Sequence, residues 1–236
     1  MRLFTLLITC LLISACSTQS TSSFKVSNLA KSDIDMVADL HRQHLKDFSQ
    51  QLMLKLYKRN PRELKKQPGA TTAGRLAQLF PAVRKDDNHL PLPRVRYAEL
   101  NNKDSVEATG LAFEPAFKGD RVFALMVGVT GMINASYDHR HSFYLTDQLD
   151  QQKLYRSARN LETVAWLLRS RKDNNGTTLI LSNGANAEGV ENFSFERLFG
   201  KMIANQDLLA QIIADGSSRT LNRVIHGAAS MTLLPI

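Results

Sequence analysis

Apolar side chains recur at steps of three and four positions along residues 34–56. The stripe consists of Ile34, Val37, Leu45, Phe48, Leu52 and Leu56, with His41 in the same series. This spacing predicts one amphipathic helix. Ser32 precedes the stripe and Asp35 follows three positions later, a pattern typical of a capping box. We therefore expect a long helix that begins after Ser32 and ends at Asn60-Pro61, where Pro61 can begin a second, short helix.

From Val122 to Tyr137 the chain carries no charged residue. These 16 residues are fewer than the roughly 20 that a membrane-spanning helix needs, and glycine and hydroxyl side chains interrupt them. The stretch therefore predicts a buried helix at the centre of the core. Gly128 and Gly131 indicate close packing against a neighbour.

Three further helical patterns follow or precede this stretch. One carries Leu154, Leu161 and Leu168 and is expected to end at Asn174-Asn175-Gly176. Another begins at Ser194 and extends to Gly216, with an expected break near Asn205. A short helix capped by Thr72 is expected to reach Phe80.

The remaining segments predict little regular structure. Residues 84–96 contain Pro91 and Pro93 and indicate an irregular connection, and residues 177–181 are either one short strand or a buried loop. A last helix is expected to start near Ser218. The patterns together predict an all-α fold, with a single globular domain of about five to seven helices around one apolar central helix.

The first 16 residues have a pattern of their own. Arg2 precedes an apolar run from Leu3 to Ile13, and the run ends in Leu12-Ile13-Ser14-Ala15-Cys16. This is the layout of a secretory signal peptide. The last five residues resemble the lipobox of bacterial prolipoproteins, in which an aliphatic residue and two small residues precede a cysteine. The alternative is an ordinary signal peptide with a chance cysteine.

The resemblance implies lipidation at Cys16. Residues 1–15 would be removed as a signal peptide, and Cys16 would carry a diacylglyceryl group and a further fatty acid such as palmitate. Residues 16–31, which begin with a polar serine- and threonine-rich run, would form a flexible tether. Residues 32–236 would form the α-helical periplasmic domain. Serine at position 17 implies, for a Gram-negative source, the periplasmic face of the outer membrane.

The cysteine count and the charge limit what the domain can do. Cys10 would leave with the signal peptide and Cys16 would be lipidated, so the folded domain would have no thiol for disulfides, nucleophilic catalysis or zinc binding. The formal net charge is +8 at pH 7. For an exported protein this favours anionic lipid, lipopolysaccharide or acidic wall polymers as counterparts, and we expect no nucleic-acid partner.

The positive charge is concentrated at the expected end of the long helix. The cluster consists of Lys55, Lys58, Arg59, Arg62, Lys65 and Lys66. Such a cluster can bind an anionic surface, with about 1 kcal/mol from each residue near a membrane. The alternative is a solvated helix end, where basic residues are favoured by the helix dipole.

Two pairs of histidines are the only candidates for metal chemistry. His41 and His44 are three positions apart and share a helical face, but no third ligand accompanies them. His139 and His141 would point about 200° apart on a helix, which favours a solvated helix end over a shared metal. We expect no cofactor and no bound metal, and no nucleophile or phosphate-binding motif is found.

Three functions remain open from the sequence. The first is a non-enzymatic envelope lipoprotein that acts as a structural or accessory partner of an envelope assembly. The second is a binding module for an anionic lipid or cell-wall fragment. The third is a metal-dependent hydrolase that uses His139 and His141 or His41 and His44.

Overall fold

Helix α2 (Asp33–Arg59) begins at the predicted capping box. The computed structural model describes residues 31–82, 91, 94–144, 147–184, 188–217 and 232–236. The Oγ of Ser32 accepts the Asp35 N–H at 3.3 Å, and the Ser32 N–H donates to Asp35 Oδ2 at 2.8 Å. These bonds satisfy N–H groups that a helix end leaves unpaired. Helix α3 (Pro61–Leu64) follows with Pro61 at its first position, so both expectations are confirmed.

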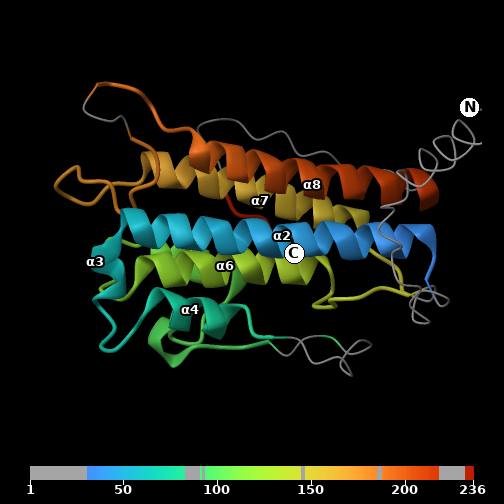
Figure 1. Ribbon diagram of the computed structural model, residues 1–236, viewed down its shortest axis with the longest axis horizontal. Helices are drawn as coiled ribbons and strands as arrows, with labels where there is room; N and C mark the ends of the chain where they lie inside the picture. Colours follow the sequence, from blue (N-terminus) through green and yellow to red (C-terminus); the bar gives the residue numbers. More distant parts are fainter. Residues whose placement is uncertain (1–30, 83–90, 92–93, 145–146, 185–187, 218–231) are drawn as a thin grey trace, which may run out of the picture. The chain divides into compact units, whose positions relative to one another are not determined.

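Four long helices form the body of the domain, namely α2, α6 (Arg121–Ser136), α7 (Gln151–Ser170) and α8 (Ser194–Ser217). Helices α6 and α8 each pack against both α2 and α7, which closes a ring. Each helix runs antiparallel to the two that it contacts (Figure 1), as in an up-and-down bundle. The described residues contain seven α-helices and no strand, only an isolated bridge between Lys172 and Thr178. The predicted all-α, single-domain fold is confirmed.

Helix α6 is the central helix of the core. Of its 16 residues, 13 are buried, and it packs against α2, α3, α5 and α7. Its hydroxyl groups bond within the helix: Thr130 Oγ1 donates to the Met126 carbonyl at 2.7 Å, and Ser136 Oγ donates to the Ile133 carbonyl at 2.8 Å. The helix therefore buries few unpaired polar atoms, and its predicted place at the centre of the core is confirmed.

Helix α5 (Ser105–Ala112) lies directly against α6 at the two glycines. A Cβ atom at Gly128 would lie 2.1 Å from Thr109 Oγ1 and 2.6 Å from the Thr109 backbone nitrogen. A Cβ atom at Gly131 would lie 2.8 Å from the Ser105 backbone nitrogen. Only glycine permits this backbone approach. The close packing was expected, but α5 itself was not predicted.

Two expected helix boundaries are wrong. Helix α4 (Thr72–Leu79) is capped by Thr71, not Thr72, because Thr71 Oγ1 accepts the Gly74 N–H at 3.0 Å. Helix α7 ends at Ser170, before the expected Asn174-Asn175-Gly176. Those residues instead form a turn in which Asp173 Oδ1 accepts the N–H groups of Asn175 and Thr177, each at 2.9 Å.

The expected break of α8 near Asn205 is also wrong. The helix continues through it because neighbouring helices hold this turn in place. His41 Nδ1 lies 3.1 Å from the Asn205 carbonyl, and the buried Gln206 amide donates to Ser136 Oγ at 3.0 Å and to Ser157 Oγ at 2.9 Å. Residues 177–181 are a loop with Ile180 buried. The helix expected from Ser218 and most of the connection at 84–96 lie outside the described residues.

Two buried asparagines each pair with a backbone segment from elsewhere in the chain. Asn60 donates from Nδ2 to the Leu181 carbonyl and accepts the Leu181 N–H at Oδ1, both at 2.7 Å. Asn160 does the same with Leu234, at 2.8 and 2.6 Å. An asparagine amide offers the same donor and acceptor as a peptide group, so each side chain satisfies the peptide groups of a segment that lies outside the helices.

Substitution of the contact glycines tests the packing of α5 on α6. We expect Gly128→Ala to lower the free energy of unfolding by several kcal/mol, because the new methyl group would meet the Thr109 backbone. At Gly200, in α8, no described residue outside the neighbouring backbone of the helix lies within 4 Å of the Cβ position. Gly200→Ala should therefore stabilise the protein by up to about 1 kcal/mol. Urea unfolding followed by circular dichroism measures both, and equal effects would contradict the close contact.

Candidate functional site

Glu63, on α3, is a buried carboxylate that joins α3 to α6. Its Oε2 accepts the Arg121 N–H at 2.9 Å and Lys66 Nζ at 2.6 Å, and its Oε1 lies 3.6 Å from Arg62 Nε. The Arg121 N–H is the first of α6, so Glu63 caps that helix from a distant part of the chain. An anion is stabilised there by the unpaired N–H groups and the helix dipole.

Arg121 folds back over the loop that precedes α6. Its guanidinium donates to the carbonyl groups of Ala112, Glu114, Pro115 and Phe117, at distances of 2.7 to 3.1 Å. Burial lowers the pKa of Arg121 from its ordinary value. The four bonds offset this burial and fix the shape of the loop at residues 112–117. Lys118 follows directly and is exposed.

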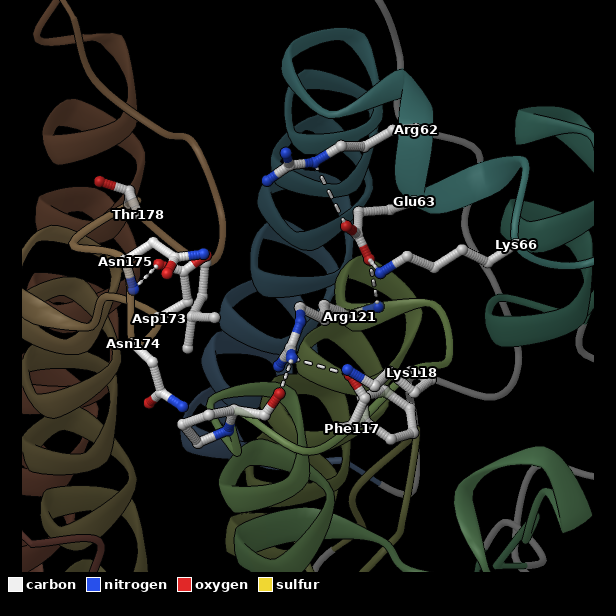
Figure 2. Close-up of a pocket in the computed structure, with 12 residues that line it drawn as sticks. Arg62, Glu63, Lys66, Phe117, Lys118, Arg121, Asp173, Asn174, Asn175 and Thr178 are labelled. Carbon is white, nitrogen blue, oxygen red and sulfur yellow. Dashed lines mark hydrogen bonds and ion pairs between the residues drawn. The ribbon is translucent and has the colours of Figure 1, made fainter.

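A pocket of about 420 Å³ opens between this corner and the turn at residues 173–178 (Figure 2). Helix α3 and the loop before α6 form one wall, and the turn after α7 forms the other. The lining residues are Arg62, Glu63, Lys66, Pro115, Phe117, Lys118, Arg121, Asp173, Asn174, Asn175, Thr178 and Leu179. Four of these side chains are cationic and two are carboxylates, so the lining has a net positive charge.

A second set of buried charges lies on the inner side of the α6 start. Asp120 is the N-cap of α6: its Oδ1 accepts the Phe123 N–H at 2.9 Å, and its Oδ2 accepts the Tyr57 hydroxyl at 2.7 Å. Arg75 Nε lies 3.6 Å from the same carboxylate. Arg75 also forms a bidentate pair with Glu99, at 2.6 and 2.7 Å. This network connects α2, α4 and α6 with the short 3₁₀ helix η2 (Ala98–Leu100).

Burial governs the ionisation of this network. It raises the pKa of the Asp120 carboxyl above its ordinary value, and it raises the pKa of the Tyr57 phenol, with the Asp120 charge as a further cause. Burial also raises the pKa of Tyr137 in the core. Both phenols therefore stay neutral in the folded protein at pH values where an unfolded tyrosine ionises.

The structure separates the six residues of the predicted basic cluster into three groups. Arg62 and Lys66 line the pocket. Lys58 and Lys65 are exposed outside it. Lys55 Nζ donates to Ser194 Oγ at 2.9 Å, and Arg59 packs so closely on Gly184 that a Cβ there would lie 2.5 Å from Arg59 Nη2. The cluster is therefore in part a contact of α2 with the start of α8 and with the loop at Gly184.

The structure places the four histidines in different surroundings. His41 contacts the Asn205 carbonyl, while His44 is exposed beside Phe48, with ring centroids 6.1 Å apart. His139 and His141 follow the end of α6, and burial lowers the pKa of His139. Within the described part of the chain, no three His, Cys, Asp or Glu side chains are placed to hold a metal ion. The predicted lipidation residue, Cys16, lies outside the described residues.

Sequence analysis did not find half of the cations in the pocket. Lys118 and Arg121 stand more than 50 positions after Arg62, and folding brings them together (Figure 2). Phe117 and the turn at residues 173–178 were not predicted to belong to a site either. Lys118 and Arg121 flank Gly119-Asp120 directly before the uncharged stretch, and this pair of cations was the signal in the sequence that could have indicated the site.

Comparisons with models of protein families, with curated proteins and with solved structures give no match to this chain. Among the helices that the structure describes, none has the length and apolar character needed to cross a bilayer. Any function is therefore inferred from the amino-terminal sequence and from the geometry of the described domain.

Replacement of Tyr57 by phenylalanine tests the polar network, and the same replacement at Tyr137, which lies outside it, is the comparison. Tyr57→Phe removes the bond to Asp120, which should cost about 1–3 kcal/mol at pH 7. Tyr137→Phe should change stability at pH 7 by less than about 0.5 kcal/mol, because the Tyr137 hydroxyl has no hydrogen-bond partner among the described residues.

The same variants should differ from the wild type at high pH. A raised phenol pKa in the folded state means that the unfolded chain releases protons first, so the wild type loses stability as pH rises above the ordinary value of 10.0. Each variant should lose less between pH 9 and pH 11, which urea unfolding across this range measures. A steeper loss in either variant would contradict the burial of these groups.

Proposed function

We propose that this protein is a lipid-anchored bacterial envelope lipoprotein whose helical domain is a non-enzymatic, accessory partner of an envelope assembly. The observation that carries the proposal is the run Leu12-Ile13-Ser14-Ala15-Cys16 after a short apolar stretch. Lipid on Cys16 would hold the protein at the periplasmic face of the outer membrane in a Gram-negative cell. Two or three acyl chains give stable anchoring, whereas one gives marginal binding.

The beginning of the described domain supports a tethered arrangement. Lys31 pairs with Asp39, donates to Ser142 Oγ at 2.6 Å, and lies 4.6 Å from the ring centroid of Tyr144. Its side chain is only 6% exposed. The tether would therefore end at a fixed point on the bundle, directly before the α2 cap at Ser32.

Exposed apolar side chains support a protein partner. Met36, Leu40 and Leu54 on α2 are all exposed, and their spacing places them within about 40° on one face of the helix. Leu208 is exposed on α8, which packs against α2. Exposed apolar side chains that recur along one helix face can contact another protein.

The second candidate function is the binding of an anionic lipid or wall fragment. The pocket favours it, because Arg62 and Lys66 meet Lys118 and Arg121 there. This function is compatible with the first, since an anchored accessory protein can also hold a ligand.

Substitution of the two cysteines tests the anchor. We expect Cys16→Ala to move the protein from the membrane fraction to the soluble fraction and to abolish incorporation of labelled palmitate. Cys10→Ala is the matched control, because Cys10 lies within the apolar run that would be removed. It should leave both properties unchanged. If the Cys16→Ala protein still sediments with membranes, the lipid is not the anchor.

Cross-linking in intact cells tests the partner. A photoactivatable residue at position 40 or 54 should give a discrete adduct with an envelope protein, because both positions are exposed on the same face of α2. The same residue at position 107, exposed on α5, is the control and should give none. Equal adducts at all three positions, or none at 40 and 54, would contradict a partner on this face.

A further inference from the structure

We propose that the pocket between α3, the loop before α6 and the turn at residues 173–178 binds an organic oxyanion, a phosphate or carboxylate carried on a small polar body. The inference deepens the second candidate function and is independent of the lipid anchor. It stands on the donors that remain unused in the pocket, on the internal hydrogen bonds that its carboxylates already accept, and on its size.

Three cationic side chains keep donors that the protein does not use. The terminal nitrogens of Arg62 make no hydrogen bond with the described residues, since only its Nε approaches Glu63. Lys118 makes no ion pair within the described part of the chain. Lys66 uses two of its three N–H donors, on Glu63 Oε2 at 2.6 Å and on the Gly119 carbonyl at 3.1 Å. These donors can meet an oxyanion in the pocket.

The carboxylates of the pocket are already satisfied. Glu63 is 2% exposed and receives the Arg121 N–H and Lys66. Asp173 Oδ1 accepts two backbone N–H groups of its own turn. Arg62 approaches Glu63 only through Nε, at 3.6 Å, and Asp173 lies in its own turn, so the terminal nitrogens of Arg62 and the ammonium of Lys118 remain for a ligand. A bound anion would accept charge-assisted hydrogen bonds from these groups.

The first N–H groups of α6 are not the proposed site. Glu63 already occupies the Arg121 N–H, and Asp120 occupies the Phe123 N–H. The side chains of Arg62 and Lys118 would therefore have to supply the contacts, with the amides of Asn174 and Asn175 on the opposite wall.

The loop that carries Lys118 is fixed before any ligand arrives. The four bonds of Arg121 hold residues 112–117, and Phe117 packs on Gly119 so closely that a Cβ at Gly119 would lie 2.5 Å from its ring. A fixed site loses less conformational entropy when the ligand binds.

The size of the pocket indicates more than a bare ion. Its volume of about 420 Å³ is within the range of about 300–1,000 Å³ that is common for small-molecule sites. Phe117, Pro115 and Leu179 provide apolar wall beside the cations. A phosphorylated sugar or the phosphoglycerol headgroup of a lipid has this combination of an oxyanion and a small body.

The two sources of such a group place different demands on the domain. Lys31 and Arg62 lie at opposite ends of α2, and its 27 residues correspond to about 40 Å. A lipid headgroup would have to meet the domain at the α3 end of the bundle, where the pocket opens. A soluble phosphosugar makes no such demand.

Calorimetric titration of the full chain in neutral detergent micelles tests the site. The soluble probes are glucose 6-phosphate and, as its uncharged control, glucose. The lipid probes are short-chain phosphatidylglycerol and, as its control, phosphatidylcholine. The pocket variant is Arg62→Gln with Lys118→Gln, and the control variant is Lys58→Gln with Lys65→Gln, which removes the same charge from exposed residues outside the pocket.

We expect one of the two anionic probes to bind and the pocket variant to weaken that binding by about tenfold or more. The control variant should change it less than about twofold. Binding of glucose 6-phosphate identifies a soluble source, and binding of phosphatidylglycerol alone identifies a headgroup. Absence of binding by both anionic probes, or equal loss in the two variants, overturns the proposal. None of these results depends on Cys16, so they are separate from the test of the anchor.

Discussion

Glu63 and Asp120 accept the first N–H groups of α6, and the Arg121 guanidinium binds the carbonyl groups of the preceding loop. These contacts join α3, the end of α5 and the loop at residues 114–117 to the start of α6. They place three charged groups where water is largely excluded, which is favourable only because each has several hydrogen-bond partners. Loss of one partner would leave a buried charge uncompensated. The pocket depends on the same contacts, because Glu63 holds together α3 and the start of α6, which carry one of its walls.

Polar side chains inside the bundle determine which segments pair. Gln206 of α8 reaches Ser136 of α6 and Ser157 of α7, so one amide links three helices. Asn60 and Asn160 each bind one distant peptide group through two hydrogen bonds. Apolar packing alone tolerates sliding of one helix along another, whereas a buried amide with specific partners does not. These residues therefore fix the register of the bundle at several points along its length.

The sequence predicts a helix correctly where the local pattern of residues agrees with the contacts that the segment makes in the folded domain. The capping box at Ser32 and the uncharged stretch of α6 specify helices that the structure contains. The prediction fails where contacts with distant segments determine whether a helix forms or continues. Asn205 has a low helix propensity, yet α8 continues because His41 and Gln206 are held by neighbouring helices. Helix α5 has small residues and no apolar stripe, and it exists because Gly128 lets it approach α6.

The site is predicted only in part, for a related reason. A run of basic residues indicates a charged surface, and Arg62 and Lys66 belong to the pocket as that run suggests. The run does not distinguish them from Lys55, which is engaged with Ser194. Nor does it include Lys118, whose position follows from the bonds of Arg121 to the loop before it. A charged surface can be inferred from neighbours in sequence, but a pocket is formed by segments that are far apart in the chain, and here Glu63 joins two of them, α3 and the start of α6, into one wall.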